Sequence, residues 1–189
     1  SVVANMSDSE RELYQSFPEA VGEDVKERPQ PADEPTDTAS IAARRRDLYA
    51  ELRATIDQLE SEGTTRGDLK ILNKTLNELR HAFSVFQPYR RQRKVTIFGS
   101  ARTPETHPTY LQAVAYSKKM AEHGWMTVAG AGLGIMEAGH RGAGIDLSMG
   151  LNIHLPFEQS ANPVIEGNHK LVTMKYFFTR KLMFVKECS

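Results

Sequence analysis

The sequence predicts an α/β fold in which a parallel β-sheet is preceded by a helical hairpin. From Lys94 onward, short β-rich runs alternate with helix-length segments, which implies right-handed βαβ crossovers and parallel strands. Two of these runs end in small residues, at 99–100 and at 130–134, as strands do where an open α/β sheet binds ligands. Before Pro88, apolar residues instead recur three and four positions apart, which is the period of a helix.

The chain begins with an acidic segment. Residues 1–40 hold ten acidic against three basic side chains, and four prolines interrupt them. Because so little apolar surface cannot offset the entropy lost on ordering, this composition favours a disordered tail over residues 1–39. The alternative is that the tail docks on the basic part that follows, where residues 41–94 hold twelve basic against seven acidic side chains.

Residues 40–87 are expected to form the helical hairpin. Ser40 is a suitable N-cap, Gly63 breaks the first helix, and Thr65 caps the second. The apolar residues of the two helices are Ile41, Leu48, Leu52, Ile56 and Leu59 in the first, and Leu69, Leu72, Leu76, Leu79, Phe83 and Phe86 in the second. The second set forms a seam of the coiled-coil kind. Such helices could cover each other, the α/β core, or the same helices in a partner.

The domain that follows, residues 94–189, is expected to hold the parallel sheet. The expected strands are 94–98, 125–129, 149–155 and a short edge strand at 171–173; the expected helices are 109–123, 134–142 and 174–186. Pro108 and Gly124 bracket the first of these helices. Residues 157–169 are expected to form a loop.

The glycine-rich turn at 130–134 is the strongest functional signal in the sequence. Gly130, Gly132 and Gly134 remove the Cβ atoms that would keep a phosphate away from the backbone, and Gly134 leads into a helix whose dipole favours an anion. Gly99 and Ser100 form a second small turn with a hydroxyl group. A short glycine motif is equally consistent with a tight turn and close helix–strand packing.

The position of the glycines argues against two common nucleotide sites. In a dinucleotide-binding fold the glycines follow the first strand and an acid about twenty residues later holds the ribose. Here the richer glycine turn follows the second strand, and Asp146 precedes the third strand. A Walker A loop is also excluded, because no Gly-Lys-Ser or Gly-Lys-Thr follows the glycines.

Arg180 and Lys181 form the second candidate group, on the helix expected at 174–186. Phe177, Arg180 and Phe184 share one face of that helix. A guanidinium on an apolar face can bind a phosphate with two parallel hydrogen bonds, or its stem can simply pass the aromatic rings to reach water. The pattern leaves both interpretations open. Arg102, close after Ser100, could also reach a phosphate.

These residues together resemble the LOG ("Lonely Guy") family of phosphoribohydrolases, whose bacterial relatives are often mislabelled lysine decarboxylases. The matching pieces, in order, are Phe98-Gly99-Ser100, then Gly130-Ala131-Gly132-Leu133-Gly134-Ile135-Met136, then Met174 through Arg180-Lys181. The resemblance implies a dimeric Rossmann-like fold that hydrolyses the N-glycosidic bond of nucleoside 5′-monophosphates, of the AMP or cytokinin type. It also implies that Arg180 is catalytic and that Gly99, Ser100, the 130–136 turn and Lys181 line the nucleotide pocket.

The sequence departs from the family in one respect. The family motif PGGxGTxxE is expected shortly after Ser189, on a strand beside the first strand, and its carboxylate is the one usually assigned to catalysis. Glu137, Glu158, Glu166 and Glu187 do not occupy the matching position. We therefore expect an incomplete sheet with an unpaired strand edge prone to association, and no hydrolysis by the 189 residues alone.

Composition narrows the remaining choices. The formal net charge is zero, which gives no general attraction to nucleic acid or to an anionic membrane, and no apolar run is long enough to span a bilayer. Cys188 is the single cysteine, so the sequence predicts a cytoplasmic protein without an internal disulfide. The six histidines have no metal-ligand spacing, and we expect no cofactor or metal. His140 and Arg141 are expected to be exposed.

Three hypotheses of function follow. The first is a nucleotide phosphoribohydrolase. The second is a binding module that uses the same turns without chemistry, such as a nucleotide sensor or a molybdenum-cofactor carrier. The third is a structural or interaction role carried by the hairpin alone.

Overall fold

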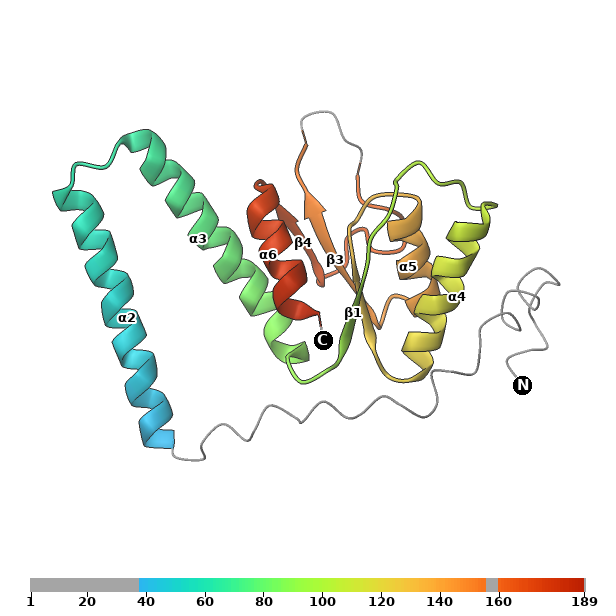
Figure 1. Cartoon of the computed structure of the whole chain (residues 1–189), viewed down its shortest axis with the longest axis horizontal. Coiled ribbons are helices and arrows are strands. Elements are labelled where there is room, and N and C mark those ends of the chain that lie inside the picture. Colours follow the sequence, from blue (N-terminus) through green and yellow to red (C-terminus); the bar gives the residue numbers. More distant parts are fainter. Residues whose placement is uncertain (1–37, 156–159, 189) are drawn as a thin grey trace. The chain divides into compact units, whose positions relative to one another are not determined.

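A computed structural model describes residues 38–155 and 160–188 and confirms the α/β fold (Figure 1). The predictions for the acidic tail lie outside the described residues, apart from the first turn of α2 (Thr38–Ser61). The chain divides into two compact units, and the boundary falls between Asn73 and Lys74. Each unit is described by itself.

The first unit contains helix α2 and the start of helix α3 (Arg66–Phe86). The turn between them has the predicted chemistry. Gly63 adopts a φ of 70°, and the amide of Thr64 donates to the carbonyl oxygen of Leu59 at 3.1 Å, as at many glycine-terminated helices. The Oγ1 atom of Thr65 accepts from the amide of Asp68 at 3.2 Å and donates to its carboxylate at 2.7 Å. Both of these expected signals are confirmed, whereas the prediction of Ser40 as the N-cap of the first helix is wrong, because Ser40 lies inside α2.

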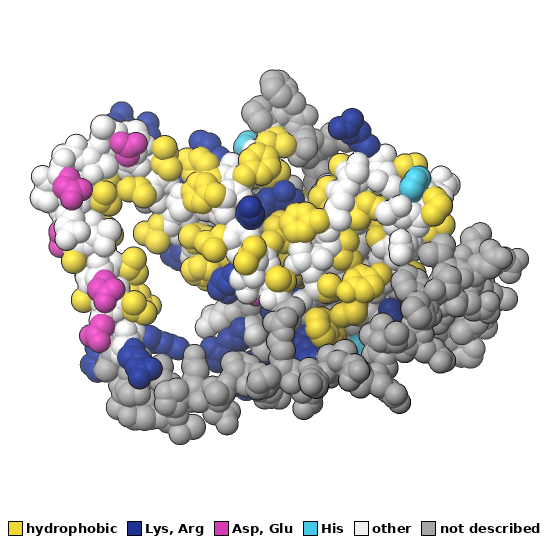
Figure 2. Space-filling view, viewed as in Figure 1, with side chains coloured by type: hydrophobic (Ala, Val, Ile, Leu, Met, Phe, Trp, Pro, Cys, Tyr) yellow, Lys and Arg dark blue, Asp and Glu magenta, His cyan; other side chains and the backbone are white. Residues whose placement is uncertain are grey.

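The apolar residues of this unit are not buried. Leu48, Leu52 and Ile56 on α2, and Leu69 and Leu72 on α3, are all large hydrophobic side chains with more than two fifths of their surface exposed. Figure 2 shows hydrophobic side chains on the surface of α2. Within the described residues, the two helices therefore do not cover one another along these faces.

The second unit is built on a four-stranded parallel sheet. Its strands are β1 (Lys94–Ile97), β2 (Met126–Ala129), β3 (Ser148–Ile153) and β4 (Leu171–Met174), in the order β1-β2-β3-β4. Ala129 of β2 pairs with Ile97 of β1 on one side and with Gly150 of β3 on the other. β4 lies at one edge of this sheet, as predicted, and β1 lies at the other.

Helices cover both faces of the sheet (Figure 1). α4 (Pro108–Glu122) and α5 (Ile135–Ala143) pack on one face, where Ile97, Ala129 and Ile135 form a small core. α6 (Phe177–Glu187) and the last part of α3 pack on the other face, where Met126, Val128, Met149, Leu151, Met183 and Phe184 form the larger core. A short 3₁₀ helix, η2 (Gln87–Tyr89), leads from α3 toward β1.

Buried hydrogen bonds join these layers. Ser117 on α4 donates from its Oγ to the carbonyl oxygen of Gly139 at 2.6 Å and lies 2.7 Å from the hydroxyl of Thr127 on β2. On the other face, the buried carboxylate of Glu78 on α3 accepts from the amide of Lys175 at 2.7 Å and from the hydroxyl of Thr179 at 2.9 Å. The carboxylate therefore fixes the start of α6, where helix amides favour a negative charge.

The last helix begins later than the sequence predicted. Met174 was expected to open it, but Met174 is the last residue of β4, where it pairs with Ile153 and is fully buried. Tyr176 is still extended, with φ −106° and ψ 134°, and α6 begins at Phe177. The pairing of Met174 in the sheet overrides the helical pattern that the following residues continue.

Candidate functional site

The two small turns predicted from the sequence lie together at the carboxyl edge of the sheet. The turn after β1 supplies the carbonyl oxygen of Ser100, which accepts from the amide of Ile135 at 3.1 Å. Gly134 precedes that amide as the N-cap of α5, with φ 64° and ψ −131°, a conformation that suits glycine. A Cβ on Gly134 would lie 2.8 Å from the carbonyl carbon of Ala101 and closer still to the oxygen of Ser100. The turns are in direct backbone contact.

Packing within the protein explains most of these glycines. A Cβ on Gly99 would lie 2.5 Å from the Cβ of Ile135, and one on Gly130 would collide with the sulfur of Met136 and with Arg180. At Gly132 the nearest atom is the Cε of Met136, at 2.7 Å, the end of a flexible side chain. The alternative kept open above, close packing within the protein, therefore accounts for Gly99 and Gly134, whereas at Gly132 only the movable end of Met136 opposes a Cβ.

Backbone amides at the glycine turn lack an acceptor within the described part of the chain. Among the described residues, the amides of Gly132, Leu133 and Gly134 donate to no protein acceptor. They precede α5, whose dipole places partial positive charge at the same point. Leu133 is exposed. The turn has the geometry of an anion-binding helix N-terminus.

Arg180 is held beside this turn. Its Nε donates to the carbonyl oxygen of Leu151 on β3 at 2.7 Å, and its guanidinium lies over the ring of Phe184, 5.3 Å from the centroid. Its Nη2 stands against Gly130, where a Cβ would strike it. Arg180 is half-buried. These contacts fix the position of the guanidinium, and phosphate binding by Arg180 stays a prediction.

Ser100, Arg102 and Lys181 have weaker connections to this group. The hydroxyl of Ser100 accepts from the amide of Arg102 at 3.1 Å, so it helps to shape the first turn. The side chains of Arg102 and Lys181 are exposed. The structure brings together Gly99, Ser100, Gly130, Gly132, Leu133, Gly134, Ile135, Met136 and Arg180. Neither Arg102 nor Lys181 has a contact in the structure that joins it to them through its side chain.

The prediction for His140 is wrong. Its side chain is fully buried, with Nε2 3.2 Å from the carbonyl oxygen of Met149 and Nδ1 3.2 Å from the side-chain amide of Asn162. Burial lowers the pKa of His140, and the two hydrogen bonds only partly oppose that change. The short helix α5 packs on the sheet beside α4, and its His140 is covered by β3 and by the loop that holds Asn162. Gly139 and Gly142 on that helix signal such close packing.

Arg141 is exposed as predicted, and it belongs to a charged group beside the turn. It forms a two-pronged pair with Glu105, at 2.9 Å for each bond, and its Nε donates to Glu137 at 3.0 Å. The hydrogen bond to Glu137 raises the pKa of Arg141. Burial, with a contribution from Glu137, raises the pKa of the Tyr110 hydroxyl. Glu137 is buried, and its carboxylate is committed to Arg141.

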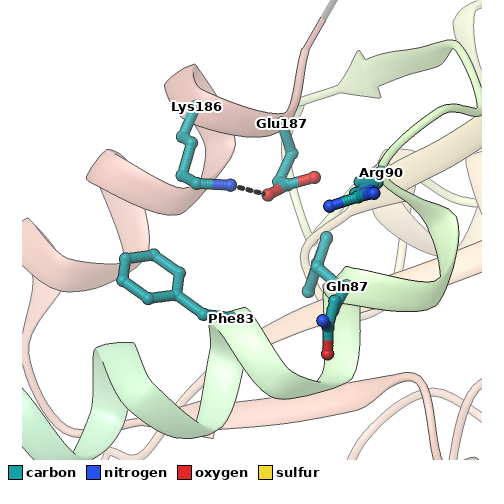
Figure 3. A pocket seen from close by; sticks show the side chains of 6 residues that line it. Phe83, Gln87, Arg90, Lys186 and Glu187 are labelled. Atoms are coloured by element: carbon teal, nitrogen blue, oxygen red, sulfur yellow. Dashed lines mark hydrogen bonds and ion pairs between the residues drawn. The ribbon is translucent and has the colours of Figure 1, made fainter. Parts of the chain in front are cut away.

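A pocket lies at the opposite, amino edge of the sheet. Its volume is about 200 Å³, and its lining consists of Phe83, Phe86, Gln87, Arg90, Lys186 and Glu187 (Figure 3). Glu187 pairs with Lys186 and, at 3.4 Å, with Lys94, the first residue of β1. None of the predicted site residues lines this pocket.

Further searches of the chain gave no match. Among the described residues, no group of three or more His, Cys, Asp or Glu side chains is arranged to hold a metal ion. The described helices also include none with the length and apolar character needed to cross a membrane. No known family model matches the chain, and no curated protein matches it either.

Proposed function

We propose that the carboxyl edge of the sheet binds the phosphate group of a nucleoside 5′-monophosphate. The observation that carries this proposal is the position of Arg180, whose guanidinium is held against Gly130 by Leu151 and Phe184. The guanidinium of Arg180 and the backbone amides of Gly132 and Leu133 are hydrogen-bond donors, and they are complementary to the tetrahedral oxygens of a phosphate.

The identity of the rest of the ligand rests on the resemblance to the LOG family. That resemblance favours hydrolysis of the bond between the base and ribose 5-phosphate, with AMP or a cytokinin riboside monophosphate as substrate. In such a reaction the C1′–N bond breaks as water adds to C1′, through a transition state with positive charge on the ribose. Arg180 would hold the phosphate, and the positive end of the α5 helix dipole would stabilise the negative charge of the phosphate.

The chemical step needs a carboxylate close to the ribose. Glu137 is the acid next to the turn, but it is buried and paired with Arg141. Hydrolysis therefore depends on the carboxylate that the family supplies from PGGxGTxxE. The proposal includes a homodimer in the cytoplasm, without a cofactor, as the resemblance and the composition imply.

A second candidate is a module that binds a nucleotide, or a molybdenum cofactor, without chemistry. The commitment of Glu137 to Arg141 favours it, because a binding site needs no free carboxylate. Assay of base release by the full-length protein separates the two candidates, because the 189 residues alone are expected to release no base in either case. Release of adenine from AMP, followed by chromatography, supports the hydrolase, and binding of AMP without release supports the module.

Calorimetric titration of the chain with AMP tests the binding proposal. Arg180→Ala is expected to weaken binding by roughly 10- to 100-fold, the usual contribution of a hydrogen bond to a charged group. Arg91→Ala is the control: it removes an exposed cation just before β1, at the opposite edge from the turn, and is expected to change affinity less than about threefold. Equal losses in both variants, or no AMP binding by the folded wild-type chain, would contradict the proposal.

A further inference from the structure

A buried side chain from a distant loop grips the glycine turn. Asn162 donates from its side-chain amide to the carbonyl oxygens of Ala131 at 3.1 Å and Gly132 at 3.0 Å. Its backbone amide also donates to the oxygen of Ala131, at 2.7 Å. Asn162 is 1% exposed, so these bonds form away from water. Consecutive carbonyls of the turn are thus fixed from one side.

His140 orients this asparagine. Its Nε2 faces the carbonyl oxygen of Met149 at 3.2 Å, which can only accept, so Nε2 carries the proton. Nδ1 is then bare and accepts one hydrogen of the Asn162 NH₂ group at 3.2 Å, so the carbonyl oxygens of Ala131 and Gly132 share the other hydrogen. This assignment is consistent with the lowered pKa of His140, because a charged ring would place an N–H against the amide of Asn162. Together with the amide of Val164, which donates to the Oδ1 of Asn162 at 3.2 Å, the bond to His140 holds the asparagine with its NH₂ group toward the turn.

The direction of these bonds has a consequence for the amides of the turn. In a trans peptide the C=O of one residue and the N–H of the next point in opposite directions. Because Asn162 binds the oxygens of Ala131 and Gly132, the N–H groups of Gly132 and Leu133 are turned away from it. These are two of the amides that donate to no protein acceptor.

We infer that Asn162, oriented by His140, is a positioning residue that presents the amides of Gly132 and Leu133 to an anionic ligand. A glycine-rich turn has a large conformational entropy to lose, so without such a clamp the amides would sample many directions. The turn is then ordered before the ligand binds, which lowers the cost of binding. That the ligand is a nucleoside monophosphate rests on the proposed function; the ordering of the turn does not.

Backbone ¹⁵N relaxation tests the ordering without any ligand. In the wild-type chain the order parameters of Gly132 and Leu133 are expected near the rigid value of about 0.85, and Asn162→Ala is expected to lower them below about 0.6. Gly124 and Gly144, in turns that Asn162 does not contact, serve as internal controls and should not change. Rigid amides at Gly132 and Leu133 in Asn162→Ala would overturn the inference.

Two substitutions of His140 separate orientation from packing. His140→Asn can place an oxygen near the position of Nδ1 and keep an acceptor for Asn162, whereas His140→Gln can keep a donor toward Met149 but not that acceptor. The inference predicts wild-type order at Gly132 in His140→Asn and disorder in His140→Gln. A rigid Gly132 in His140→Gln with a mobile one in His140→Asn, or an equal drop of the order parameter in both variants, would overturn it. If the variants do not fold, the ring ¹⁵N shifts of the wild type decide, since a protonated Nδ1 contradicts the arrangement.

Affinity for AMP and for inorganic phosphate gives the functional readout. Asn162→Ala is expected to weaken both by about tenfold, the cost of ordering one or two residues on binding. Unchanged affinity for both ligands would overturn the role in presentation. If the wild-type chain binds neither ligand, the proposed function fails, and the relaxation experiment still decides whether Asn162 orders the turn.

Discussion

The two edges of the parallel sheet both gather polar groups, and they treat them in opposite ways. At the amino edge, Lys94 donates from Nζ to the carbonyls of Tyr89 at 2.7 Å and Gln92 at 3.1 Å, and Lys170 donates to those of Ile145 and Asp146. Both lysines are almost completely buried. At the carboxyl edge, the amides of the glycine turn have no acceptor among the described residues.

The difference supports the proposal that the carboxyl edge, and not the amino edge, binds a ligand. At the amino edge the chain neutralises its own charges: burial lowers the pKa of Lys170, with Asp146 opposing the change, and Glu187 is shared by two lysines. The pocket there is lined in part by the paired side chains of Lys186 and Glu187 (Figure 3). At the carboxyl edge the donors are oriented but not satisfied. Polar groups without a partner call for an explanation, and a ligand at the carboxyl edge would supply it.

Breaking the amino-edge pair should give the largest effect on stability. Glu187→Ala leaves the ammonium of Lys94 buried without its carboxylate, and the free energy of unfolding is expected to fall by about 3–5 kcal/mol. Urea denaturation measures it. Affinity for AMP in the folded fraction should not change, because Glu187 lies at the other edge from the turn.

The double variant Lys94→Met with Glu187→Leu is the control for that prediction. It removes both charges and fills their space, so most of the lost stability should return. A double variant as unstable as the single one would mean that Lys94 is held by the carbonyls of Tyr89 and Gln92, and that Glu187 acts only through packing.

At the carboxyl edge, two glycines should respond differently to the same added methyl group. Gly134→Ala forces an unfavourable φ and strikes the backbone of Ser100, and we expect a loss of about 3 kcal/mol. Gly132→Ala meets only the end of Met136, and a loss below about 1 kcal/mol is expected, with weaker AMP binding as its main effect. Equal losses of stability would show that the turn tolerates no Cβ anywhere and would remove the distinction between packing and ligand-facing glycines.

The pH dependence of the free energy of unfolding should reveal the burial of His140 beside Asn162. Because the pKa of His140 is lowered in the folded state, the unfolded chain takes up the proton first. Stability is complete above the ordinary histidine pKa of about 6.5 and falls as the pH drops below it, by at most about 1.4 kcal/mol per pH unit. His140→Gln should lose this slope, as measured by urea denaturation between pH 7.5 and 5. His81→Gln, at an exposed position, should keep it.

The sequence was sufficient for the architecture and for part of the site. The alternation of β-rich runs with helical segments predicted the parallel sheet, and the small turns marked the edge where Arg180 lies. Three dimensions were needed for His140 and Asn162. They are 22 positions apart in the sequence. Burial is predicted from the periodic spacing of apolar residues, and that spacing gives no signal for a polar residue on a short helix or in a loop. Glycines that serve packing, such as Gly99, also look the same in sequence as those that face a ligand.

The exposed pair near the turn should give the smallest effect. Glu105 and Arg141 form two bonds of 2.9 Å, but both side chains are about half exposed, so water and salt weaken their attraction. Glu105→Gln is expected to lower the free energy of unfolding by about 0.5 kcal/mol or less and to leave AMP affinity within about twofold. A loss above about 2 kcal/mol would mean that Glu105 fixes the loop after β1 through Arg141. The charged side chains at the carboxyl edge would then stabilise the fold by pairing with one another, as those at the amino edge do.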